Sequence, residues 1–217
     1  MILSFLRTSL RHLVRNRTYA SLNILGLSVG LACFAIIGMW VEQQLSFDRM
    51  HEKAGRIYQV NATVSEETGT FSRATTPAPL ASAMLNDLPE IDRALRMDVS
   101  DAVVKSEAEQ FVEKGILAAD PSFFDFFDFR LLKGDPATAL SEPYSVVVSE
   151  HIAKKYFGDR DPVNESLRIF QYDPEGNGAD FKITGIIEDG PVNTHFGYSM
   201  IISFSTIEVA EPESLTE

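Results

Sequence analysis

The chain has 217 residues, of which 45% are hydrophobic and 23% charged, and its formal net charge is −12. This composition excludes a disordered, collagen-like or low-complexity protein. Residues 1–41 contain four arginines and no acidic residue, so residues 42–217 carry the remaining net charge of −16. A domain this acidic repels phosphate backbones, which argues against nucleic-acid binding. The single cysteine, Cys33, excludes a disulfide within the chain and a zinc site built from cysteines.

Residues 1–17 have the pattern of an amphipathic helix lying at the cytoplasmic face of a membrane. Leucine and valine recur at helical spacing, and Arg7, Arg11 and Arg15 follow every four residues along the flank of this stripe. Arginine stems can lie along lipid while their guanidinium groups reach anionic headgroups. We therefore expect these three arginines and Arg17 at the membrane interface. The alternative is that the arginines only set the topology.

Residues 18–41 predict one transmembrane helix. They contain no Asp, Glu, Lys, Arg or His, and the run Leu22–Val41 would form a helix about 30 Å long, the thickness of the hydrocarbon core. Arginines before the run and acidic residues after it place the N-terminus in the cytoplasm and residues 42–217 outside, with Trp40 near the outer interface. A cleavable signal peptide and a buried helix of a soluble protein are the alternatives, and the length of the apolar run disfavours both.

Two glycines inside this run, Gly26 and Gly30, form a G-x-x-x-G pattern. Small residues four apart let two helix backbones approach closely in lipid, so the pattern predicts a helix-packing face. The alternative is that the glycines are scattered in a hydrophobic helix without a packing role.

We expect the helix to continue through residues 42–55 as a stalk, ending at Gly55, and residues 56–217 to form an extracytoplasmic domain. Helical and extended patterns alternate there, which indicates an α+β fold with one mixed sheet. The predicted helices follow Pro79 and cover residues 122–127 and 150–157. The predicted strands are residues 57–64, 94–99, 103–105, 111–118, 145–149, 167–172, 181–187 and 198–203.

The sequence lacks the common nucleotide-binding and catalytic motifs. The sequence has no G-x-x-x-x-G-K-[ST], G-x-S-x-G or H-E-x-x-H pattern, and its four histidines lack ligand spacing, so we expect no catalytic, cofactor or metal site and no enzyme activity. Asp173, Glu175 and Asn177, followed by Gly178, imitate the start of a calcium loop. Position twelve is Thr184 where such a loop has Glu, which favours a polar hairpin turn. Residues 123–129 are aromatic at five of seven positions. We expect most of these rings in the core and the remainder on an apolar partner or substrate surface.

Several residue runs occur in the order and spacing of one protein family, beside a first membrane span. They are Arg15-Asn16-Arg17, Leu22–Gly30, Leu45-Ser46-Phe47-Asp48, His51-Glu52, Arg56-Ile57-Tyr58, Thr76–Leu80, Leu131–Pro136 and Ala153–Gly158. The chain thereby resembles the MacB/FtsX-type ABC transporter permeases that carry a MacB-like periplasmic core domain. The motif residues after the span are Ser46, Phe47, Asp48, His51, Arg56 and Tyr58.

The resemblance implies a permease subunit of an ABC-type exporter in the bacterial inner membrane, with residues 56–217 in the periplasm. It further implies a cytoplasmic ABC ATPase as partner, which would bind the ATP, and a second permease half or a homodimer. Complete members have further spans, whereas no second long hydrophobic run precedes Glu217. We therefore expect an N-terminal fragment with an incomplete periplasmic core. The alternatives are a single-pass, membrane-tethered binding or sensory module and, less favoured, a membrane-anchored hydrolase.

Overall fold

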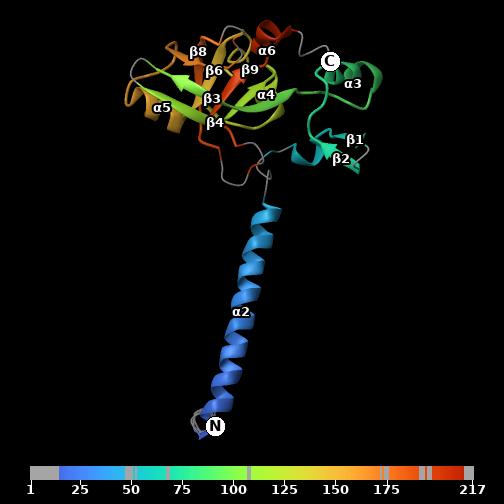
Figure 1. Cartoon of the computed structure of the whole chain (residues 1–217), viewed down its shortest axis with the longest axis vertical. Helices are drawn as coiled ribbons and strands as arrows, with labels where there is room; N and C mark the ends of the chain where they lie inside the picture. The colour runs from blue at the N-terminus through green and yellow to red at the C-terminus, as the bar shows by residue number, and fades with distance from the viewer. Residues whose placement is uncertain are drawn as a thin grey trace. The chain divides into compact units, whose positions relative to one another are not determined.

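The structure, a computed structural model, describes residues 15–46, 51, 53–66, 69–106, 109–171, 173, 176–190, 194 and 197–212. The chain divides into two units, Met1–Phe47 and Asp48–Glu217, and the second is called the sheet domain below. The first contains one long helix and the second a sheet with short helices (Figure 1). Residues 1–14 of the predicted interfacial helix, with Arg7 and Arg11, and the motif residues Phe47 and Asp48 lie outside the described residues.

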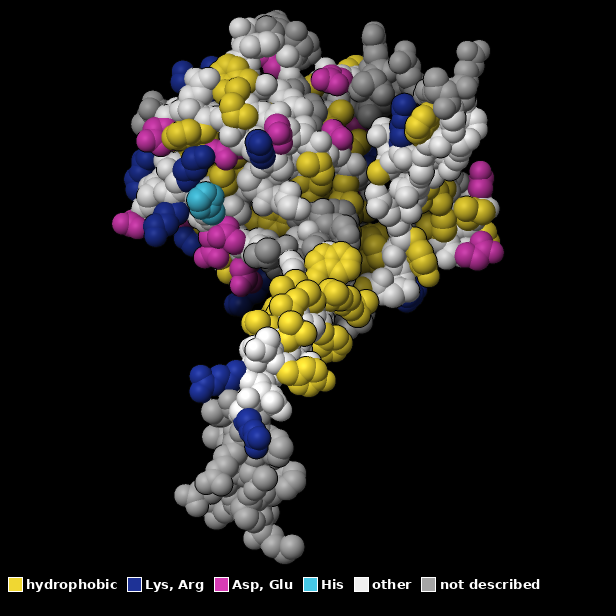
Figure 2. Space-filling model, turned by 60° about the horizontal axis from the view of Figure 1, so that its bottom comes forward, with side chains coloured by type: hydrophobic (Ala, Val, Ile, Leu, Met, Phe, Trp, Pro, Cys, Tyr) yellow, Lys and Arg dark blue, Asp and Glu magenta, His cyan; other side chains and the backbone are white. Residues whose placement is uncertain are grey.

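The long helix α2 spans Arg17–Leu45, and none of its residues is buried. The face of α2 seen in Figure 2 is dominated by hydrophobic side chains, with arginines at the N-terminal end. Its two serine hydroxyls find acceptors within the helix: Ser28 Oγ donates to the Ile24 carbonyl at 2.7 Å and Ser21 Oγ to the Thr18 carbonyl at 3.1 Å. These two hydroxyls are thus satisfied within the helix, as an apolar surrounding requires.

The expected continuation of this helix to Gly55 is wrong. The helix ends at Leu45, where both the N–H and Oγ of Ser46 donate to the Gln43 carbonyl, at 3.2 and 2.8 Å. Bonds of this kind, three residues back, tighten and terminate an α-helix. Gly55 instead lies inside a short 3-10 helix, η1, at Ala54–Arg56.

In the described part of the sheet domain, a seven-stranded sheet has the order β5-β8-β6-β9-β4-β3-β7. Strand β7 also pairs with β8, so the six strands β8, β6, β9, β4, β3 and β7 form a closed sheet. Strand β5 is not part of this closure and pairs with β8. The pairs β4–β9 and β6–β8 are parallel and the other pairs are antiparallel, which confirms a mixed sheet. The strands are β3 (Met97–Lys105), β4 (Gln110–Ala119), β5 (Leu131–Lys133), β6 (Ser145–Ser149), β7 (Ser166–Ile169), β8 (Ala179–Ile187) and β9 (Met200–Ser203).

Four short helices and a separate hairpin complete the described elements. They are α3 (Leu80–Asp87), α4 (Phe123–Phe126), α5 (Glu150–Phe157), α6 (Ser205–Ala210), and the antiparallel pair β1 (Ala62–Glu66) and β2 (Gly69–Arg73). The α+β class is confirmed, and β6 followed by α5 has the predicted bounds. The strand expected at 57–64 begins only at Ala62, and β2, β5 and α6 were not predicted.

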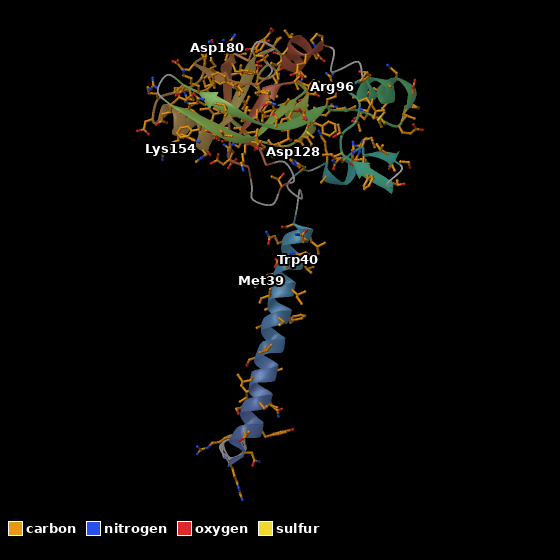
Figure 3. The ribbon with its side chains drawn as sticks, viewed as in Figure 1. Met39, Trp40, Arg96, Asp128, Lys154 and Asp180 are labelled. Atoms are coloured by element: carbon orange, nitrogen blue, oxygen red, sulfur yellow. The ribbon has the colours of Figure 1, made fainter. Side chains whose placement is uncertain are left out.

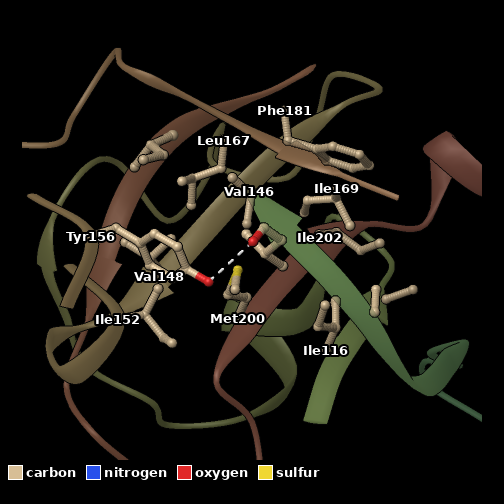
Figure 4. Close-up of a cluster of buried hydrophobic side chains, with 14 of the residues drawn as sticks. Ile116, Val146, Val148, Ile152, Tyr156, Leu167, Ile169, Phe181, Met200 and Ile202 are labelled. Atoms are coloured by element: carbon tan, nitrogen blue, oxygen red, sulfur yellow. Dashed lines mark hydrogen bonds between the residues drawn. The ribbon is translucent and has the colours of Figure 1, made fainter. Parts of the chain in front are cut away.

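The sheet domain has two hydrophobic clusters, one on each face of the sheet. Figure 4 shows the first, which includes Val146, Val148 and Met200. The second contains Val147, Leu117 and Phe123. Successive residues of a strand point to opposite faces, so β6 contributes to both clusters and all five of its residues are buried.

Strands β7 and β8 follow one another in the chain and pair antiparallel from Ile169↔Ala179 to Ser166↔Lys182. The prediction of a hairpin turn here is therefore confirmed. A cross-strand ion pair accompanies it, with Arg168 Nε and Nη2 each 2.8 Å from a carboxylate oxygen of Asp180.

Candidate functional site

Helix α2 is long and apolar enough to cross a membrane. Gly26 and Gly30 lie four residues apart, and a Cβ placed on either would meet nothing within 4 Å. Their helix face is therefore open to a neighbouring helix. Trp40 is 60% exposed and lies near the C-terminal end of α2 (Figure 3). At 1.5 Å per residue it is about 34 Å along the axis from Arg17, close to the thickness of a hydrocarbon core.

The motif residue His51 is buried in the sheet domain, with 4% of its surface exposed. Its Nδ1 accepts a hydrogen bond from the Asp128 backbone N–H at 3.1 Å. Its ring centroid lies 5.1 Å from that of Phe127 and 4.9 Å from that of Phe129. A backbone N–H can only donate, so Nδ1 carries no proton and the ring is the neutral tautomer. The 3.9 Å approach of Asp128 Oδ2 to Nδ1 is consequently not an ion pair.

Lys53 contacts the same aromatic segment two residues later. Its Nζ donates to the Asp125 carbonyl at 3.1 Å, one of the last carbonyls of α4, which α4 itself cannot satisfy. The other described motif residues of the sheet domain are on the surface: Arg56 is exposed, and Tyr58 is 82% exposed. Ser46 belongs to the first unit, at the end of α2. Among the described residues, His51 thus has a contact role in the domain interior, whereas Arg56 and Tyr58 lie on the surface.

The aromatic run 123–129 connects this contact to the core. Phe123 and Phe127 are 0% and 2% exposed, and Phe124, Phe126 and Phe129 pack against the same cluster. The prediction that most of these rings lie in the core is met in part: two are buried in it, and the other three are partly buried against it. The cluster includes Leu117, Val147 and Ile201, which come from three adjacent central strands, β4, β6 and β9.

A buried carboxylate on β4 was not predicted from the sequence. Glu113 is 7% exposed, and its Oε1 accepts from Lys155 Nζ at 2.6 Å and from the Tyr156 hydroxyl at 2.7 Å. Burial, and then the hydrogen bond to Glu113, raise the pKa of Tyr156 well above its usual value, so the hydroxyl remains a donor. Lys155 Nζ also lies 4.2 Å above the ring of Phe111. This cluster ties α5 to β4, and Tyr156 lies among the core side chains in Figure 4.

A second unpredicted cluster surrounds Arg96, which is labelled in Figure 3. Its Nη2 lies 2.7 Å from Asp120 Oδ1 and 2.9 Å from Glu208 Oε1, and its guanidinium carbon lies 4.3 Å from the centre of the Phe204 ring. The hydrogen bond to Asp120 raises the pKa of Arg96, and burial acts against it. Arg96 thereby ties α6 to the ends of β3 and β4. Neither cluster was visible in the sequence, since the partners are 24 to 112 residues apart.

Within the described ranges, no group of three or more His, Cys, Asp or Glu side chains could hold a metal ion. Within the Glu113 cluster, and likewise within the Arg96 cluster, the charged groups are paired with groups of opposite charge. This arrangement fits a role in holding secondary-structure elements together.

The sequence matches the family model for the MacB-like periplasmic core domain over residues 20–216. The chain belongs to this family. A comparison with curated proteins finds no match. The family match covers both α2 and the described sheet, and it indicates a component of an ABC-type transporter permease.

Among solved structures, the sheet domain is similar to a domain assigned to a permease protein of Porphyromonas gingivalis. The TM-score is 0.58 at 22% identity, over 72% of this chain and 64% of that one. This likeness shows a shared fold, and the chain spans less than two thirds of the length of that structure.

Two further structures are less similar. The periplasmic region of MacB from Actinobacillus actinomycetemcomitans has a TM-score of 0.49 at 14% identity, over 64% of this chain and 59% of that one. The extracellular domain of YknZ, a noncanonic ABC-type transporter of Gram-positive bacteria, has a TM-score of 0.48 at 14% identity, over 64% and 70%. Together with α2, the family match fits a membrane protein with an extracytoplasmic domain.

Proposed function

We propose that the MacB-like chain is a permease subunit of an ABC-type exporter, or the N-terminal part of one, in the inner membrane. A cytoplasmic ATPase partner moves its periplasmic domain. The observation that carries the proposal is the family match over residues 20–216, which includes a helix able to cross a membrane and the sheet that follows it.

Charge supports the orientation. Arg15 and Arg17 stand at the N-terminal end of α2, and no acidic residue precedes Glu42. Positive residues are retained on the cytoplasmic side during insertion, which supports a periplasmic location of the sheet domain. The ATP site belongs to a partner in this proposal, since the sequence contains no phosphate-binding G-x-x-x-x-G-K-[ST] loop.

The surface of α2 supports a partner within the membrane. None of its residues is buried, and the Gly26–Gly30 face is open. Small residues allow close backbone contact in lipid, so we propose that this face packs against a span of a second permease half or a second copy. Replacing Gly26 with Leu should weaken self-association in a two-hybrid assay, and unchanged association would contradict this packing.

Co-purification tests the proposed function. The tagged chain is cross-linked in native membranes and purified in mild detergent, with an unrelated single-span protein as the control. We expect enrichment of a polypeptide that carries a Walker motif. Failure to enrich any ATPase over the control would contradict the proposal.

Cysteine labelling tests the topology. Cysteines introduced at Arg15 and at Lys154, both exposed, are treated with a membrane-impermeant maleimide on intact spheroplasts. We expect labelling at position 154 and none at position 15 until the cells are lysed. The reverse pattern would place the sheet domain in the cytoplasm.

An alternative is a single-pass, membrane-tethered binding or sensory module. The closure of the sheet through β7 and β8, with clusters on both faces, favours a domain that folds without a partner. This function requires a ligand that binds in the absence of any ATPase, which isothermal titration against periplasmic extract fractions would detect.

A further inference from the structure

The first described residues of the sheet domain are attached to its aromatic segment by two contacts. Only residues 47–50 separate Ser46, which ends α2, from His51 in the sequence. His51 accepts from the Asp128 N–H, and Lys53 donates to the Asp125 carbonyl. Both contacts hold the same short segment, which lies more than 70 residues away in the chain.

The two contacts differ in character. His51 is 4% exposed and packs against the rings of Phe127 and Phe129, so removing it costs apolar contact as well as a hydrogen bond. Lys53 is exposed, and its contact to a carbonyl competes with water. His51 therefore provides most of the attachment.

A short chain of packed side chains connects this segment to the centre of the sheet. Phe127 is 2% exposed and its ring centroid lies 5.3 Å from that of Phe123, which is 0% exposed. Both belong to the cluster that contains Val147 of β6, in the middle of the sheet. Close-packed interiors deform little, so a displacement at His51 is passed to the strands.

We propose that His51 and Lys53 form a junction latch, which holds the start of the sheet domain against Asp125–Phe129 and passes movements of α2 to the sheet. His51 is a positioning residue in this scheme. The passing of movement rests on the proposed transport function, whereas the holding does not.

The holding is tested by amide hydrogen exchange on the full chain in lipid nanodiscs. In His51→Ala, the Asp128 amide should exchange about tenfold faster, because its acceptor is lost. The Val146 and Val148 amides in β6 should keep their protection. His51→Asn offers an acceptor oxygen near the position of Nδ1 and should restore most of the protection at Asp128. Unchanged exchange at Asp128 in His51→Ala would overturn the latch.

Matched variants keep this test decisive. Tyr58→Ala removes a large ring that is 82% exposed, seven residues further on, and should leave Asp128 exchange unchanged. Lys53→Ala, a change at the surface, should speed amide exchange around position 53 and leave the protection of the β6 amides unchanged. If Tyr58→Ala accelerates Asp128 exchange as much as His51→Ala does, the effect is not specific to the latch and the proposal fails.

The passing of movement is tested in membranes that contain the co-purified ATPase. A spin label at Lys154, on the exposed side of α5, should change its spectrum on addition of ATP. In His51→Ala this change should fall several-fold while the amount of bound ATPase stays the same. An undiminished response would overturn the passing of movement, whereas absence of any ATPase partner would overturn the proposed function and leave the exchange result standing.

Discussion

Helix α2 and strand β6 are both rich in apolar residues, yet they lie in opposite surroundings. No residue of α2 is buried within the protein, whereas all five residues of β6 are. The reason lies in the backbone. A helix satisfies its own N–H and C=O groups and can present apolar side chains to lipid on every side, whereas a strand needs a neighbour on each edge. β6 has them in β8 and β9.

The comparison shows that apolar content alone does not locate a core. β6 is apolar because the domain covers both of its faces with its own side chains, through the clusters around Val148 and Val147. α2 is apolar although none of its residues is buried, which fits an apolar medium outside the chain. The two elements should therefore respond differently when a charge is introduced.

The largest effect is expected for Val147→Asp in β6. Val147 is 0% exposed, and an isolated carboxylate there would be desolvated without a partner. The free energy of unfolding should fall by about 4 kcal/mol or more, a large part of the stability of a domain of this size. Urea denaturation followed by circular dichroism measures it. The control is Val112→Asp, at a β4 position that is 65% exposed, where the loss should stay below about 1 kcal/mol.

A charge in the middle of α2 should act on insertion and not on the fold of the sheet domain. Leu31→Arg should make membrane insertion about 3–4 kcal/mol less favourable, from the cost of Arg and the loss of Leu at the helix centre. Alkaline carbonate extraction should release more of the variant than of the parent chain. Thr18→Arg, beside Arg17, should not increase extraction, because a charge at the helix end reaches the interface. Equal extraction of Leu31→Arg and the parent would argue against a spanning helix.

A smaller loss of stability is expected for a change at a buried polar group that has hydrogen-bond partners. Tyr156→Phe removes the hydroxyl that donates to Glu113, while Lys155 still donates to that carboxylate. The free energy of unfolding should decrease by about 1 kcal/mol. Tyr58→Phe, at an exposed ring, should leave it unchanged, and a loss as large as that of Tyr156→Phe would show that burial does not set the difference.

The smallest effect concerns exposed ion pairs. The hydrogen bond from Lys133 lowers the pKa of Asp161, and that from Arg168 lowers the pKa of Asp180. Because the folded-state values lie below the unfolded ones, the stability from these pairs is present above the unfolded pKa, about 3.9, and is lost as the pH falls through the folded values. Asp180→Asn should slightly reduce the loss of stability between pH 5 and pH 2 in urea titrations. An unchanged pH profile would contradict this, and Asp92→Asn, at another exposed carboxylate, is the control.

Local signals explain which elements could be predicted. The bounds of β6 and α5 were correct because Ser149 caps the helix, accepting from the Ile152 N–H, and Gly158 ends it with a φ of 62°. β5 was missed because it is three residues long and exists through its pairing with β8. The stalk was predicted too long because Ser46 and Gln43 end α2 with a local bond that the apolar pattern does not reveal.

The candidate functional residues divide in the same way. His51 was singled out by its place in a motif, but it is buried against a distant segment, where its Nδ1 accepts from the N–H of Asp128, 77 residues away. The helix face of Gly26 and Gly30 follows from spacing along one helix, and its packing role stays a prediction. The Glu113 and Arg96 clusters join residues from separate elements, so no pattern of neighbours indicated them.

By itself, the sequence determined the apolar helix, the charge asymmetry around it, the α+β class and the resemblance to the MacB-like family, because each depends on composition or on residues close along the chain. Only the tertiary structure decided the strand order, the closure of the sheet by β7 on β8, and the burial of His51 against the aromatic segment. These depend on contacts between residues far apart in the chain, whose energies are fixed only when the whole sheet is packed.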